Sequence, residues 1–494
     1  MAPSEPVARY TPQLRTALVL TGTGTAGAYH AGVLRALSEA GVKIDLIAGR
    51  GVGAVGALFG AIDAGARLWE PDGLWRSAPV RRLYRWRRSL RVACWMLAVA
   101  FAAVGLPVLV LAGAVIAFPI GYFLGLVGLD AGATIATAYA GWLDAVFAPT
   151  GAPSYLPPLV VVVVAFLLAF LVTDALATAM RPGARRRARG GFWWRLLGTP
   201  LDQGRAVDWF ASGLWRIMRG AARIATPSHE DLGQRYVELL ADNLGDRGFR
   251  EILVLAHDVD ARRDIVFALL TDAHRSAFFG GRTAPDADER SLETVDLVPA
   301  ARHAVDAVAG ALSVPVITDP RLVTFAPDSA WRGETHRLCD RFDGMSRLLD
   351  DVARAGAEQV IVVSAIPRAA GPHALGSDRR DIRGRAGQYL LGLETAALRD
   401  AVASRRDRFE AVFEVRPDHN PLGPFDFGGC YDERSDRRHS LAELVDRGYE
   451  DASRQFVDAV VGESGESIDA PPGAPRSREP SLSERLAAHG STTD

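Results

Sequence analysis

Lysine and cysteine are scarce in this 494-residue chain, and neither sign of charge dominates it. Cys94, Cys339 and Cys430 are too few and too scattered for a disulfide framework or a zinc site. Lys43 is the only lysine, and 56 basic residues against 58 acidic ones give a net charge of -2. Such a balance creates no field that would attract nucleic acid. We therefore expect neither a metal nor a nucleic-acid partner.

Charge is also missing from two long segments. Residues 92–129 contain no charged side chain, and a helix of that length would extend about 57 Å, against about 30 Å of membrane hydrocarbon. Pro107 and Pro119 would divide it into a span plus an interfacial piece, or into two short crossings. A second run, residues 156–173, is long enough for one span. The sequence thus predicts a transmembrane helical hairpin over residues 90–180.

The flanks of this insertion predict its topology. Six arginines precede it and five follow it, whereas the segment between the runs carries only Asp130 and Asp144. The arginines are Arg81, Arg82, Arg85, Arg87, Arg88, Arg91, Arg181, Arg185, Arg186, Arg187 and Arg189. Because positive flanks stay in the cytoplasm, we expect an even number of crossings in the cytoplasmic (inner) membrane, a multi-pass protein and a cytoplasmic soluble domain. The same arginines would suit anionic lipid headgroups, and the rival interpretation is a helical hairpin buried in a soluble core.

Strand and helix patterns alternate on both sides of the insertion. Residues 17–20 and 44–48 are apolar runs typical of strands, and each precedes a helical pattern; the second such helix is expected over residues 54–68. Further strands are expected at 251–256, 265–270, 314–317 and 359–364. Alternation of this kind predicts a mainly parallel α/β sheet in one discontinuous domain, residues 12–80 and 205–462. Residues 464–494 are predicted to be a disordered tail, and the polar start of the chain indicates no cleavable signal peptide.

A glycine-rich loop follows the first strand and opens the first helix. It consists of Gly22, Thr23, Gly24, Thr25, Ala26 and Gly27. A loop of this form would bind the pyrophosphate of NAD or FAD, or would aim backbone N–H groups at the oxyanion of an acyl-transfer intermediate. Asp45 has suitable spacing for a ribose contact, but it starts the second strand instead of ending it.

A second loop favours the acyl-transfer interpretation. Gly49, Arg50, Gly51, Val52 and Gly53 lie between a strand and an Ala-rich helix, in the frame G-x-S-x-G of a nucleophile elbow. The central residue is Gly51 and not serine. Glycine tolerates the strained backbone of such a turn but supplies no hydroxyl, so the turn would survive without its nucleophile.

These motifs together resemble the patatin-like phospholipase family. The match includes residues 20–34 (LTGTGTAGAYHAGVL), the elbow, and Arg341-Phe342-Asp343-Gly344-Met345, which is similar to the family's D-G-[GA] motif. It covers roughly residues 15–70 and 205–370. The resemblance implies a three-layer α/β sandwich, a lipid or fatty-acyl ester ligand, no cofactor, and a Ser-Asp dyad. In that dyad Asp343 would be the acid and Gly51 would hold the position of the nucleophile.

The departures from the family pattern concern its chemistry. Thr23 stands at the second glycine of the family's loop, Ala26 at its basic residue, and Met345 where a small residue is usual. Without a hydroxyl at position 51 no acyl-enzyme forms by the family's route. We therefore favour a non-hydrolytic protein that binds membrane lipid. The alternatives are a lipid acyl hydrolase that uses water activated by Asp343, and an NAD- or FAD-binding protein.

Three further features have competing interpretations. Arg50 would either form an anion site beside Gly51 or be a surface residue paired with an acid. For His30, packing is favoured over catalysis. The segment 420–436 (NPLGPFDFGGCYDERSD) lies outside the resemblance, and its composition favours turns over a metal-binding loop built from Asp426, Asp432, Glu433 and Asp436.

Overall fold

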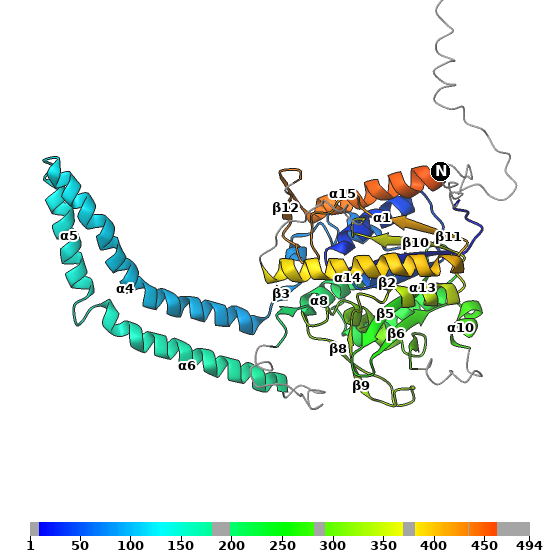
Figure 1. Cartoon of the computed structure of the whole chain (residues 1–494). Helices are drawn as coiled ribbons and strands as arrows, with labels where there is room; N and C mark the ends of the chain where they lie inside the picture. The colour runs from blue at the N-terminus through cyan, green and yellow to red at the C-terminus, as the bar shows by residue number, and fades with distance from the viewer. Residues whose placement is uncertain (1–8, 180–197, 281–291, 369–380, 433, 462–494) are drawn as a thin grey trace, which may run out of the picture.

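A mostly parallel sheet forms the centre of the α/β domain in the computed structural model (Figure 1). The structure describes residues 9–179, 198–280, 292–368, 381–432 and 434–461, so the predicted tail lies outside the described residues. The strand order is β11-β10-β1-β2-β5-β6-β7, with β9 and β8 added beside β5. The parallel strands are β1 (Thr16–Thr21), β2 (Leu46–Arg50), β5 (Glu251–Asp258), β10 (Gln359–Ser364) and β11 (Ala411–Val415). Antiparallel pairing adds β6 (Arg263–Leu269), β8 (Arg321–Thr324) and β9 (Thr335–Cys339), and β7 (Thr294–Asp296) lies parallel to β6.

Helices cover both faces of this sheet. Side chains alternate along each strand, so Leu18 and Leu20 enter one apolar core while Ala17 and Val19 enter the other. The first core is covered by α1 (Ala26–Glu39), α2 (Gly53–Gly60), α8 (Gly204–Met218), α9 (His229–Asn243), α12 (Ala304–Ala311) and α15 (Leu441–Ala452). The second core is covered by α10 (Asp272–Phe279), α13 (Met345–Arg354) and part of α14 (Ile382–Arg405). The predicted mixed α/β class with a mainly parallel sheet is confirmed.

Two local predictions are wrong. The helix expected over residues 54–68 is divided, because α2 ends at Gly60 and a short α3 (Ala66–Trp69) follows a turn. Residues 314–317 do not form a strand but a turn after α12. Val316 in this turn has a φ of +68°, which lies outside the extended region that a strand requires.

The apolar insertion forms three helices that project away from the domain (Figure 1). They are α4 (Arg88–Leu126), α5 (Ala131–Val146) and α6 (Ala152–Ala179), and α4 packs against both of the others. Pro107 and Pro119 lie inside α4, so neither proline ends it. Two stretches are long and apolar enough to cross a membrane, Arg88–Leu126 and Ser154–Asp174, and 0% and 6% of their most apolar windows are buried. That exposure contradicts the interpretation as a hairpin buried in a soluble core, while the membrane topology stays a prediction.

Both ends of the insertion leave the domain at one place. Strand β3 (Arg85–Trp86) pairs antiparallel with β4 (Leu201–Asp202), which closes the root of the hairpin. The carboxylate of Asp319 accepts hydrogen bonds from Arg87 Nη2 at 2.6 Å and from Thr199 Oγ1 at 2.8 Å. The chain therefore enters and leaves the insertion through neighbouring residues outside the central sheet.

Candidate functional site

The turn after β2 has the backbone of a nucleophile elbow. β2 ends at Arg50, Gly51 has a φ of +56°, and α2 begins at Gly53. Val52 N–H donates a hydrogen bond to the carbonyl oxygen of Gly22 at 2.9 Å. A Cβ placed on Gly51 would lie 2.2 Å from that same carbonyl oxygen. The strand–turn–helix geometry is therefore present, but backbone of the first loop occupies the space that a side chain at position 51 would need.

The segment around Pro424 closes the glycine-rich loop. Thr25 N–H donates to the Pro424 carbonyl oxygen at 3.0 Å, and Thr25 Oγ1 donates to the Gly423 carbonyl oxygen at 2.8 Å. A Cβ on Gly24 would approach the Pro424 oxygen to 2.0 Å. The remaining loop residues, Ala26 and Gly27, already belong to α1. Because the N–H of Thr25 is bonded within the protein, this contact disfavours both an oxyanion site and a pyrophosphate site in the loop.

The carboxylate that lies against Gly51 is that of Asp340, whereas the sequence predicted Asp343. Asp340 Oδ2 is 3.1 Å from the Cβ position of Gly51, and the Gly51 backbone N–H acts to lower the pKa of the Asp340 carboxyl. Asp343 is three residues further on, with a side chain that is 64% exposed and that pairs with Arg341 at 2.8 Å. This pairing lowers the pKa of Asp343. The position of Asp340 directly after β9 is the sequence signal that could have identified it.

Arg50 lies in a buried network of polar groups. Its guanidinium pairs with Glu394 of α14 and lies 3.5 Å from Asp340 Oδ2, and its Nε donates to Thr21 Oγ1 at 2.9 Å. Thr23 Oγ1 donates to Glu394 at 2.7 Å. Arg50 is thus neither a surface residue nor a free anion site, because internal partners use its nitrogens. Glu394 was missed by the sequence analysis, since nothing in the pattern of α14 connects it with the glycine loop.

Burial controls the ionisation of two groups near the elbow. Desolvation raises the pKa of Asp340 to about 6, although the nearby Arg50 charge acts in the opposite direction. Asp340 Oδ2 has no hydrogen-bond partner in the described part of the chain. Desolvation also lowers the pKa of His30 to about 4, and His30 Nε2 lies 3.1 Å from the Thr21 carbonyl oxygen. His30 is therefore neutral at pH 7 and packed inside the domain.

Replacing Asp340 with asparagine is expected to change the pH dependence of stability. The unfolded carboxyl titrates near pH 4 and the folded one near pH 6, so ionisation costs the folded wild type on the order of 3 kcal/mol, and this cost develops as the pH rises from 4 to 6. Asparagine carries no charge at either pH. Thermal unfolding of the full chain in detergent should show Asp340→Asn gaining stability relative to wild type between pH 4.5 and 7.5. A difference in stability between the two proteins that does not change with pH would contradict this prediction. The titration of His30 occurs in both proteins, so it does not contribute to the difference.

The acids of the segment 420–436 take part in local hydrogen bonds. Asp432 has a pKa lowered to about 2, because hydrogen bonds from Arg434 N–H, Ser435 and His419 outweigh its desolvation. Asp436 accepts a hydrogen bond from the Tyr431 hydroxyl at 3.0 Å, and Glu433 lies outside the described residues. Within the described ranges no three His, Cys, Asp or Glu side chains are grouped to hold a metal ion.

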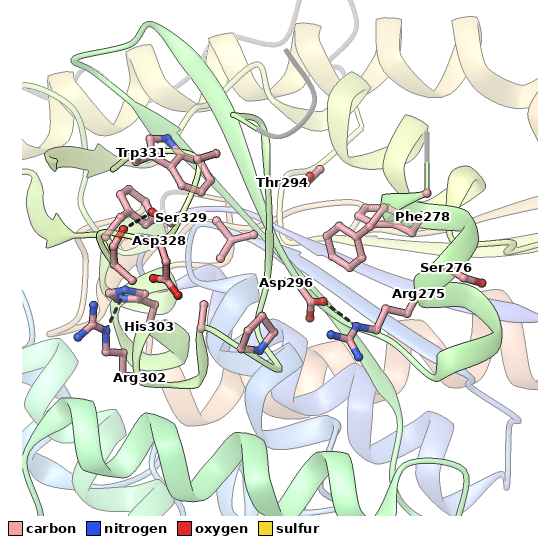
Figure 2. Close-up of a pocket in the computed structure, with 18 of the residues that line it drawn as sticks. Arg275, Ser276, Phe278, Thr294, Asp296, Arg302, His303, Asp328, Ser329 and Trp331 are labelled. Carbon is pink, nitrogen blue, oxygen red and sulfur yellow. Dashed lines mark hydrogen bonds and ion pairs between the residues drawn. The ribbon is translucent and has the colours of Figure 1, made fainter. Parts of the chain in front are cut away.

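A cavity of about 910 Å³ lies between α10, β7 and the segment 325–331 (Figure 2). None of its lining residues comes from the glycine-rich loop or the elbow. Its cations are held by neighbours: Arg275 pairs with Asp296 at 2.6 Å, and Arg302 Nε donates to His303 Nε2 at 3.3 Å. Of the two arginines that line this cavity, Arg275 is therefore paired with a carboxylate and Arg302 contacts a histidine.

Comparison with known proteins gives a distant structural likeness. No family model matches the chain, and no curated protein matches it. Among solved structures, VipD from Legionella pneumophila aligns with 93% of this chain and 72% of its own, at 12% identity and a TM-score of 0.28.

Proposed function

We propose that this chain is a membrane-anchored, patatin-like protein that binds membrane lipid without hydrolysing it. The observation that carries the proposal is the Gly22 carbonyl oxygen, which lies 2.2 Å from where a nucleophile's Cβ would be. The family resemblance is supported by helices on both faces of the sheet and by an aspartate, Asp340, opposite the elbow. The dyad of the family would thus be represented by Gly51 and Asp340, with Asp340 in the role that the sequence assigned to Asp343.

Hydrolysis by activated water is the second candidate, and the geometry disfavours it. Asp340 would be ionised at pH 7 and could act as a base, but its side chain is only 1% exposed. The N–H groups of Val52 and Thr25, which would stabilise an oxyanion, donate to the carbonyls of Gly22 and Pro424. A substrate would need both the glycine-rich loop and the segment around Pro424 to move.

The exposed apolar helices support membrane anchoring. Large apolar side chains of α4 and α6, such as Phe101, Leu109 and Phe166, are exposed. Exposure of so much apolar surface to water is unfavourable, whereas lipid would cover it. The arginine-rich flanks favour an inner-membrane position with the α/β domain in the cytoplasm. The bound class of molecule would then be a phospholipid of the same bilayer.

Purified full-length protein, in detergent and in liposomes, tests the absence of hydrolysis. We expect turnover of short-chain esters and phospholipids no faster than in protein-free samples, and the same result for Asp340→Asn. Mass spectrometry of the purified protein should detect retained phospholipid. Turnover that Asp340→Asn abolishes would establish the hydrolase instead, and equilibrium binding of NAD or FAD would establish the dinucleotide alternative.

A further inference from the structure

A second cavity, of about 680 Å³, lies beside the root of the hairpin. It is formed by the 3-10 helix η1 (Ala78–Arg82), Leu83 and the first half of α8. Arg81, Arg82 and Arg205 line it, together with the single acid Asp208. We call this cavity the basic groove. Asp208 lies 3.3 Å from His229 and is 72% exposed, so it neutralises the three arginines only weakly.

The arginines of the basic groove lack acidic partners among the described residues. In the described part of the chain Arg81, Arg82 and Arg205 make no ion pair, in contrast to Arg275 of the first cavity and to the buried Arg50. Slight desolvation and the positive charges of Arg205, Arg91 and Arg82 lower the pKa of neighbouring Arg85. The groove is therefore a concentration of uncompensated positive charge in a chain whose net charge is close to zero.

Arginines from both sides of the hairpin contribute to this cluster. Arg81 and Arg82 belong to the arginine run that precedes the hairpin, but Arg205 follows the hairpin and is brought to the same cavity by α8. The groove also offers apolar contact through Pro79 and Leu83. A group that combines negative charge with hydrocarbon fits such a lining better than a bare anion does.

The location of the groove indicates the source of that group. η1 is separated from β3 by only two residues, and β3 leads directly to α4. In Figure 1, β3 and α8 lie on the side of the domain from which α4 and α6 project. The groove therefore lies close to the point where the candidate membrane spans begin. Cytoplasmic leaflets carry a negative surface potential from anionic lipids, which attracts arginine.

We propose that the basic groove binds the headgroup phosphate of an anionic phospholipid in the bilayer that the hairpin enters. This inference rests on the proposed function and specifies its lipid class and site. The guanidinium groups of Arg82 in η1 and Arg205 in α8 would hold the phosphate oxygens. Trp209, whose indole N–H is buried without an acceptor among the described residues, would line the site beside the lipid.

The test uses the full chain in detergent and three soluble probes. These are dihexanoyl phosphatidylglycerol, dihexanoyl phosphatidylcholine and inorganic phosphate, and binding is measured by calorimetric titration. The variant Arg82→Gln/Arg205→Gln removes one positive charge from η1 and one from α8. Arg216→Gln is the matched control, because Arg216 is an exposed arginine of α8 that does not line the groove. Both variants change exposed side chains, so their thermal midpoints should equal that of wild type.

We expect wild type to bind the anionic lipid in preference to the zwitterionic one, and the double variant to bind it at least about tenfold more weakly. Arg216→Gln should change binding less than about twofold. If the double variant keeps wild-type affinity, the groove is not the site, yet lipid binding and the proposed function remain. If phosphate alone binds as tightly as the lipid, the lipid assignment is overturned. If wild type binds neither lipid, the proposed function itself fails.

Discussion

Gly51→Ser is expected to destabilise the protein without creating a hydrolase. The residue has a φ of +56°, where a non-glycine residue costs about 1–2 kcal/mol, and its new Cβ would overlap the Gly22 carbonyl oxygen at 2.2 Å. Relief of that overlap requires backbone movement, which costs a further amount of about 1–3 kcal/mol. The displaced loop is the one that accepts the hydrogen bond from Val52 N–H, so the elbow would be distorted together with it.

Gly220 provides a matched control for the steric part of this effect. Its φ is also +56°, but no atom lies within 4 Å of the position of its Cβ. Thermal unfolding of Gly220→Ser should therefore report the backbone cost alone, and Gly51→Ser should unfold at a clearly lower temperature. Equal stability of the two variants, combined with ester hydrolysis by Gly51→Ser, would show that the elbow has room for a nucleophile and that only the hydroxyl was missing.

Glu394→Ala is expected to have the largest effect on stability of any single change in the buried network. It leaves the Arg50 guanidinium, which is fully buried, without its closest anion, and breaking a buried pair in this way costs about 3–5 kcal/mol. Thr23 Oγ1 also loses its acceptor. Asp340, at 3.5 Å from Arg50, supplies only part of the lost compensation.

Asp400→Ala is the matched control, because it also places an alanine in α14 but lies outside the buried network. Asp400 is 68% exposed and pairs with the exposed Arg399, so its removal should cost no more than about 1 kcal/mol. Chemical denaturation of both variants in detergent measures the difference. A loss for Glu394→Ala as small as that for Asp400→Ala would mean that the network is hydrated and contributes little, and the closed-site interpretation would then be untenable.

Local patterns were sufficient to predict a mainly parallel sheet and the strand–turn–helix unit around Gly51. The strand at 46–50, the glycines that follow it and the helix from Gly53 are consecutive in sequence, so their spacing alone fixes a strand–turn–helix unit. The run 314–317 shows the limit of this reasoning. Its apolar composition is typical of a strand, but the Ile317 carbonyl accepts from Leu201 N–H at the hairpin root and Val316 adopts a positive φ. A contact between distant segments determined the conformation there.

Which aspartate lies against Gly51, and which segment covers the glycine-rich loop, depend on contacts that no local pattern encodes. Asp340 and Asp343 are three residues apart, and only the direction of the chain after β9 decides which of them faces Gly51. Glu394 and Pro424 reach the glycine-rich loop from segments about 370 to 400 positions later, as their bonds to Thr23 and Thr25 show. Glycine spacing predicted a loop able to receive a ligand, whereas the fold fills it with the protein's own groups.

The two ends of the apolar insertion lie together, outside the central sheet. β3 precedes the apolar insertion and β4 follows it, and the two strands pair with each other. Asp319 also accepts hydrogen bonds from Arg87 before the insertion and from Thr199 after it. The two ends of the insertion are therefore hydrogen-bonded together. With such an arrangement, deletion of the apolar insertion would leave the order of the strands in the central sheet unchanged.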